Sequence, residues 1–108
     1  MFSLTTPDTV VTDNNIDAIL IAKERTALSE NAFYELVIWQ VPSPVPGSGH
    51  GFKYRLALVV GGECVLRYDN ERGKGDHRHI GEREELFDFT TLEALLTAFE
   101  RDMEMILG

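Results

Sequence analysis

The sequence predicts an α+β fold: an antiparallel meander sheet of about four to six strands with one C-terminal helix packed on one face. The residues at 52–60 alternate along a predicted strand, and Gly61-Gly62 follows as a two-residue turn, which is typical of a β-hairpin. Near the chain end, apolar residues recur at steps of three and four, the spacing of an amphipathic helix. The 108 residues, 44% of them apolar, suffice for a single hydrophobic core.

The first part of the chain predicts a lead-in and two strands. Residues 1–15 are polar and show no clear period, so we expect a flexible N-terminal lead-in before a single domain at 16–108. A short apolar run within 16–25 predicts a first strand, and 26–31 a turn. Aromatic and β-branched residues at 33–41 predict a second strand.

The hairpin follows a loop at residues 42–49, which is rich in proline and glycine. Residues 52–60 alternate regularly, and Gly61-Gly62 allows the positive φ values of a two-residue turn. A regular register from that turn pairs Val60 with Glu63. It then places Lys53, Arg55, Tyr68 and Asn70 on one face, with Arg67 and Asp69 on the other.

The chain after the hairpin contains a glycine-rich turn and further strands. Gly73 and Gly75 flank Lys74, an arrangement that suits either a plain surface turn or backbone amides approaching a phosphate. We expect strands at 76–80 and 86–89.

A helix is expected to begin after Thr90, which with Glu93 has the form of a capping box. Its apolar stripe consists of Leu92, Leu95, Leu96, Phe99, Met103 and Ile106.

Charge is distributed unevenly along the chain. The formal net charge is −8, which argues against general nucleic-acid binding. Residues 53–83 nevertheless hold seven of the ten Lys and Arg residues, and His77 and His79 also lie there. This window predicts either a local anion-binding site or a solvated face of mixed charge.

Other classes are disfavoured by composition. The single cysteine, Cys64, excludes an internal disulfide, and we expect it to be a small buried side chain. The longest apolar runs are too short for a membrane span, and residues 1–8 do not have the pattern of a secretory signal. We therefore expect a cytoplasmic protein that does not interact with membranes.

His77-Arg78-His79 is the strongest chemical feature of the sequence. In an extended strand its two imidazoles point to the same side, about 7 Å apart. One histidine can then accept the 2′-hydroxyl proton of RNA while His or Tyr68 protonates the leaving oxygen. The predicted substrate-binding residues are Lys53, Arg55, Arg67, Lys74 and Arg78.

Two other interpretations of these residues remain open. His77 and His79 could bind a divalent metal ion together with Asp69 or Asp76. Alternatively, the histidines lie on the surface without a ligand, and Asp69-Asn70 only ends a strand. The preferred chemistry needs no metal and no cofactor.

Two motifs, Arg67-Tyr68-Asp69-Asn70 and Asp76-His77-Arg78-His79, together with Lys53-Tyr54-Arg55 and Phe89-Thr90-Thr91, resemble the TumE-type family of toxins from toxin–antitoxin pairs. The resemblance implies a cognate antitoxin, usually of the helix-turn-helix type, and an attack on RNA or on translation. It carries no catalytic assignment to individual residues.

The leading hypothesis is therefore a metal-independent endoribonuclease toxin. A non-catalytic module that binds RNA or an acidic protein is the alternative, and a metal-dependent phosphodiesterase is third. An exposed sheet edge would also allow two copies to pair as a homodimer.

Overall fold

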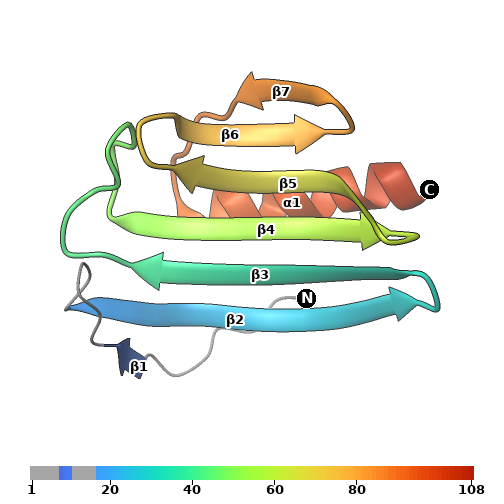
Figure 1. The fold of residues 1–108 in the computed structure, drawn as a ribbon, viewed down its shortest axis with the longest axis horizontal. Coiled ribbons are helices and arrows are strands. Elements are labelled where there is room, and N and C mark those ends of the chain that lie inside the picture. Colours follow the sequence, from blue (N-terminus) through green and yellow to red (C-terminus); the bar gives the residue numbers. More distant parts are fainter. Residues whose placement is uncertain (1–7, 11–16) are drawn as a thin grey trace.

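The computed structural model describes residues 8–10 and 17–108 (Figure 1). Apart from the short strand β1, the expected lead-in at 1–15 lies outside the described residues. The elements are β1 (Asp8–Val10), β2 (Ala18–Ser29), β3 (Ala32–Gln40), β4 (Phe52–Val60), β5 (Glu63–Glu71), β6 (Gly75–Ile80), β7 (Arg83–Leu86) and α1 (Leu92–Leu107).

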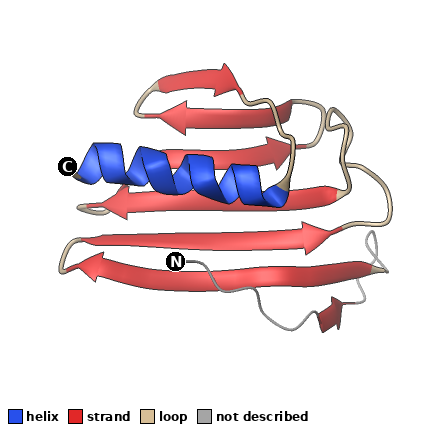
Figure 2. Cartoon of the chain, turned by 180° about the vertical axis from the view of Figure 1, so that it is seen from behind, coloured by secondary structure: helices blue, strands red, loops and turns tan. Residues whose placement is uncertain are grey.

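The strands form one antiparallel sheet in which each strand pairs with its neighbours in sequence, from β1 to β7. Helix α1 lies across one face of this sheet (Figures 1 and 2). The predicted α+β meander with a C-terminal helix is therefore confirmed. No helix among the described residues has both the length and the apolar character that a membrane span needs.

The core lies between the sheet and α1. Alternate residues of β3 and β4 face the helix, as the period-two pattern of a half-covered sheet requires. Leu36, Ile38, Leu56 and Leu58 are all at most 1% exposed. Each such side chain contributes about 1.5–3 kcal/mol relative to an exposed position. From the helix, Leu95, Phe99 and Met103 complete the core cluster.

The helix begins one residue later than the sequence suggested. Thr91, not Thr90, is the N-cap, and its hydroxyl accepts a hydrogen bond from the Ala94 amide at 3.0 Å. Thr91 has the extended backbone that an N-cap requires. The predicted capping box of Thr90 and Glu93 is therefore wrong, although the apolar stripe is correct in its buried members.

The hairpin at Gly61-Gly62 is confirmed, but its expected register is wrong. Val60 pairs with Glu63 and Val59 with Cys64, after which Leu58 pairs with Leu66. The register therefore shifts by one residue at Val65, the position of a β-bulge. The Val65 carbonyl instead accepts a hydrogen bond from the Gly81 amide at 3.1 Å, which ties the hairpin to the turn after β6.

The bulge changes which side chains share a face, because side chains alternate between the two faces of a strand. Arg55 lies opposite Asp69, and Tyr68 lies opposite Leu56. The expected group of Lys53, Arg55, Tyr68 and Asn70 on one face does not form.

Three smaller expectations also need correction. The first long strand, β2, continues to Ser29 instead of ending at a turn at residue 26. The last strand is Arg83–Leu86, whereas Phe87 and Phe89 follow it and pack against the core. Cys64 is exposed and not buried, because it lies beside the hairpin turn on the face away from α1.

Two loops lock together beside the start of β6. The Gly73 amide donates to the Pro46 carbonyl at 2.6 Å. A Cβ atom on Gly75, whose φ is +74°, would lie only 2.8 Å from the Gly47 carbonyl oxygen. Glycine is therefore required at this backbone-to-backbone contact. The glycine-rich turn serves loop packing, and its Gly73 amide is not free for a phosphate.

Candidate functional site

The two faces of the sheet differ, and the histidine pair lies on the face away from α1, here called the open face. His77 pairs with Asp69 and His79 with Arg67 across β5 and β6. The alternate residue, Arg78, faces the helix and contacts Asp102 at 3.2 Å. Because side chains alternate along a strand, both imidazoles belong to the open face. Their ring centroids are 6.4 Å apart, close to the separation expected from the sequence.

Hydrogen bonding holds His79 as a potential proton acceptor. Its Nε2 lies 3.1 Å from Arg67 Nη2. A guanidinium group can only donate hydrogen bonds, so this imidazole nitrogen carries the lone pair. The other ring nitrogen, Nδ1, lies 3.7 Å from Glu84 Oε2. In this arrangement Nε2 is the ring nitrogen that can accept a proton.

The surroundings of His77 have the opposite character. Its Nδ1 lies 3.0 Å from the Gly75 carbonyl oxygen, which can only accept. Its Nε2 lies 3.6 Å from Glu84 Oε1. Acceptors therefore face both ring nitrogens, the environment that suits a protonated imidazole. One histidine of the pair is arranged as an acceptor of protons and the other as a donor.

Arg67 connects the histidines to an acidic neighbour. Its Nε lies 3.0 Å from Asp69 Oδ2, although the N–H is not directed at that oxygen. Asp69 Oδ1 is 3.9 Å from His79 Nε2. A recess of about 30 Å³ lies among these groups. It is lined by Arg67, Asp69, Glu71, Lys74, His77, His79 and Glu84, here called the histidine recess.

Tyr68 is not part of the histidine recess. It is fully buried among the core residues that pack against α1, on the other face of the sheet. Its hydroxyl donates to Asp102 Oδ2 at 2.5 Å. Arg78 lies on the same side, paired with Glu85 and Asp102. Neither residue is brought together with the histidines.

The buried hydroxyl of Tyr68 predicts a loss of stability at alkaline pH. Burial, and then the hydrogen bond to the Asp102 carboxylate, raise its pKa from 10.0 to about 12. Between these values the folded protein keeps a proton that the unfolded chain has lost, so stability falls as pH rises. In Tyr68→Phe we expect a shallower decline between pH 10 and pH 12, measured by urea unfolding at several pH values. An unchanged slope would contradict this role. Some decline should remain, because burial and Asp76 also raise the pKa of Tyr54.

The other predicted cations are distributed around the recess. Lys53 and Arg55 extend from β4 on the open face, and Arg55 contacts Glu35 at 3.2 Å. Lys74 lies in the turn before β6, 3.5 Å from Glu71, and lines the recess. Arg67 and Lys74 thus lie at the recess, whereas Lys53 and Arg55 belong to the neighbouring surface.

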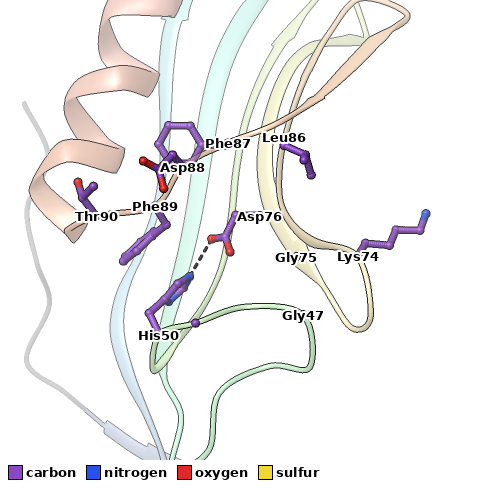
Figure 3. Close-up of a pocket in the computed structure, with 11 residues that line it drawn as sticks. Gly47, His50, Lys74, Gly75, Asp76, Leu86, Phe87, Asp88, Phe89 and Thr90 are labelled. Atoms are coloured by element: carbon purple, nitrogen blue, oxygen red, sulfur yellow. Dashed lines mark hydrogen bonds and ion pairs between the residues drawn. The ribbon is translucent and has the colours of Figure 1, made fainter.

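A larger pocket of about 620 Å³ opens on the helix side of β6, beside the loop that joins β3 to β4 (Figure 3). Asp76 forms its polar centre and is half-buried, with 8% of its side chain exposed. Its carboxylate accepts hydrogen bonds from Ser48 at 2.8 Å, His50 at 2.7 Å and Tyr54 at 2.6 Å. Asn70 donates to Ser48 and to the Phe52 carbonyl oxygen.

His50 has no ring nitrogen left for proton transfer. Its Nε2 donates to Asp76, and its Nδ1 accepts from the Phe52 amide at 3.2 Å. The ring also stacks on Phe89, with centroids 3.6 Å apart. These groups satisfy one another, so the larger pocket has the bonding pattern of a structural lock for the β3–β4 loop. The smaller histidine recess is therefore the better candidate for chemistry.

Only weak signals in the sequence pointed to this lock. His50 follows directly after the predicted loop at 42–49 and had no predicted role, Asp76 was expected as an alternative metal ligand, and Asn70 was expected at the end of a strand. All three lie on the helix side, because Asn70 and Asp76 pair with each other and alternate with the open-face residues. Neither predicted alternative metal ligand set, His77 and His79 with Asp69 or with Asp76, emerges as a cluster. Among the described residues, no group of three His, Cys, Asp or Glu side chains is arranged to hold a metal ion.

Comparison with known proteins gives a family match. The model of the family described as Toxin TumE matches residues 3–107, nearly the whole chain. No curated protein and no solved structure matches the chain.

Proposed function

The chain belongs to the TumE toxin family, and from this premise we propose that it is a toxin that cleaves RNA as a metal-independent endoribonuclease. The family assigns it to a toxin–antitoxin system and implies a cognate antitoxin. The reaction and its residues are our proposal.

The observation that carries the proposal is the unequal hydrogen bonding of the two histidines. His79 Nε2 faces a donor on Arg67, whereas both nitrogens of His77 face acceptors. A general base needs a nitrogen with a lone pair, and a general acid needs a nitrogen with a proton to give, so the two environments suit the two roles. Because the ring centroids are 6.4 Å apart, both imidazoles can reach groups of one phosphodiester that lies at the mouth of the recess.

In the proposed reaction, His79 Nε2 removes the proton from a 2′-hydroxyl group. The 2′-oxygen attacks the adjacent phosphorus, and the bond from phosphorus to the 5′-oxygen breaks. His77 Nε2 supplies the proton to that leaving oxygen. The products are a 2′,3′-cyclic phosphate and a 5′-hydroxyl end, and the two histidines exchange protonation states.

Arg67 has two proposed roles. Without substrate it occupies the His79 lone pair, at 3.1 Å. When a phosphate enters, the guanidinium group donates to a non-bridging oxygen and releases the imidazole to the 2′-hydroxyl. Arginine suits this role because its several N–H donors match phosphate geometry. It also stabilises the negative charge that develops on the phosphate oxygens.

The mechanism predicts cleavage that does not require a divalent ion. We expect purified protein to cut RNA in excess EDTA at a rate close to that with Mg²⁺, and to leave 2′,3′-cyclic phosphate ends. Gel analysis of a 5′-labelled RNA, with and without acid treatment to open the cyclic phosphate, measures both. Cleavage that stops in EDTA would assign the histidines to a metal-dependent reaction. Complete absence of cleavage would favour the non-catalytic binding module.

The cognate antitoxin is proposed to be a helix-turn-helix protein. Its co-expression is expected to suppress both growth inhibition and RNA cleavage.

A further inference from the structure

We infer, resting on the proposed function, that the open face binds RNA as a single strand that extends from the histidine recess across β5 and β4 to Trp39 on β3. The substrate class is thus unpaired RNA, and the binding surface includes residues of β2 and β3 that the sequence did not mark. Figure 1 views the sheet from this side, with α1 behind it.

The size of the recess requires such a surface. Its volume of about 30 Å³ is close to the space one water molecule takes up in the liquid. The recess can therefore admit a hydroxyl group or a phosphate oxygen but not a nucleotide. The bases and sugars on either side of the cleaved bond must lie outside it, on a surface that continues from it. The histidine recess opens onto the open face, and no described helix or strand covers that face.

Charge on the open face favours a polyanion. The strand registers place Lys23, Arg25, Lys53, Arg55 and Arg67 there, half of the ten Lys and Arg residues. The acidic side chains that β2 to β7 place on the same face are Glu35, Asp69, Glu71 and Glu84, whereas the chain has eighteen acids. On β2 to β7 this face thus carries slightly more cations than acids, although the protein as a whole is strongly acidic, so folding gathers cations that attract phosphate on it.

Trp39 supplies the second element of single-strand recognition. It pairs with Lys53 on the open face, whereas its neighbour Ile38 is fully buried under the helix. The indole is half-buried, so part of its surface faces solvent. An aromatic ring beside a cation binds one base by stacking and the adjacent phosphate by charge. Trp39 lies three strands from His77, about 14 Å across the sheet at the usual strand spacing, and two residues along β3 from the row that contains His77.

The chemistry also favours an unpaired strand. Bases that stack on a protein ring must be free of their partner strand. Attack by the 2′-hydroxyl in line with the leaving oxygen requires a rotated backbone, which the regular A-form duplex prevents. A broad sheet face can lie along an extended RNA strand, whereas it cannot enter the deep, narrow major groove of duplex RNA.

The test uses the fact that the chain has one tryptophan. In a His77→Ala/His79→Ala background, which removes cleavage, titration with a single-stranded 12-nucleotide RNA should quench Trp39 fluorescence. The same RNA annealed to its complement should bind at least tenfold more weakly. By fluorescence anisotropy, Trp39→Ala and Lys53→Glu/Arg55→Glu should each weaken binding by about tenfold or more. Trp39→Phe, which keeps an aromatic ring, should retain most of the affinity.

Matched charge reversals away from the open face serve as controls. Arg83→Glu/Arg101→Glu makes the same change in net charge at exposed positions, on the helix side of β7 and on α1. This variant should lose much less affinity than Lys53→Glu/Arg55→Glu. Circular dichroism checks that each variant folds.

The outcomes separate this inference from the proposed function. Single-strand binding of the expected kind, with no cleavage by the unmutated protein, would overturn the nuclease proposal and leave the binding surface. Cleavage that survives with normal RNA affinity in the Trp39 and Lys53/Arg55 variants would overturn the surface and leave the nuclease. Loss of antitoxin binding alone in these variants would assign the open face to the protein partner, and equal binding of duplex RNA would contradict the single-strand preference.

Discussion

Replacing His77 with alanine is expected to slow cleavage of ordinary RNA by about 10²–10⁴-fold, because the 5′-oxygen then leaves without a proton donor. The same variant should cleave a ribonucleoside 3′-(4-nitrophenyl phosphate) almost as fast as the unmutated protein. Nitrophenolate is a stable anion and needs no general acid. Rates on the two substrates, measured by gel and by absorbance, separate the acid from every other role.

His79→Ala is the matched comparison for this experiment. As the proposed base, His79 is needed with both substrates, so its variant should lose a similar factor on each. If both variants lose activity equally on the nitrophenyl ester, the acid and base assignments are wrong. If neither loses activity on RNA, the histidine recess is not the catalytic site.

Replacing Asp76 with alanine is expected to reduce the free energy of unfolding by about 3 kcal/mol or more, because three hydrogen-bond donors lose their acceptor at about 1–3 kcal/mol each. The hydroxyls of Ser48 and Tyr54 and the Nε2–H of His50 would then lose their acceptor in the pocket. Buried donors without acceptors are costly. Because small domains have only about 5–15 kcal/mol of stability, this change removes a large part of it.

Urea unfolding measures the effect, and Asp88→Ala provides the control. Asp88 lines the same pocket and carries the same charge, but it is exposed. Its replacement should change stability by at most about 0.5 kcal/mol. Tyr54→Phe removes one donor and should cost less than Asp76→Ala. Equal stability of the Asp76 and Asp88 variants would show that the Asp76 contacts do not hold the loop.

Regular patterns in the sequence predicted most of the fold. The alternation of residues 52–60 matches β4, and Gly61-Gly62 forms the expected hairpin turn. The apolar stripe near the chain end predicted α1 and the residues that it buries. These predictions are robust because burial of one face imposes a period on the side chains. Boundaries were less accurate, as Thr91 and the last strand show, because several polar residues nearby suit the same end.

The candidate site was predicted only in part. The extended segment at residues 76–80 correctly placed His77 and His79 on one side. The pairing of β5 with β6 brings Arg67 beside them. Tyr68, Arg55 and Lys53 were expected together, but one extra residue at Val65 moved Tyr68 under the helix. A bulge has no clear mark in this sequence. Its energetic basis is tertiary, because the Val65 carbonyl pairs with the Gly81 amide beyond the next strand.

The sequence by itself determined which residues alternate and which stripe is apolar, since those patterns follow from local backbone geometry. It therefore determined the meander, the helix and the common side of the two histidines. Only the tertiary structure decided the face on which each cation lies and the groups that contact the ring nitrogens of the two histidines. Those depend on strand register and on contacts between residues far apart in the chain, where a shift of one residue exchanges the two faces of the sheet.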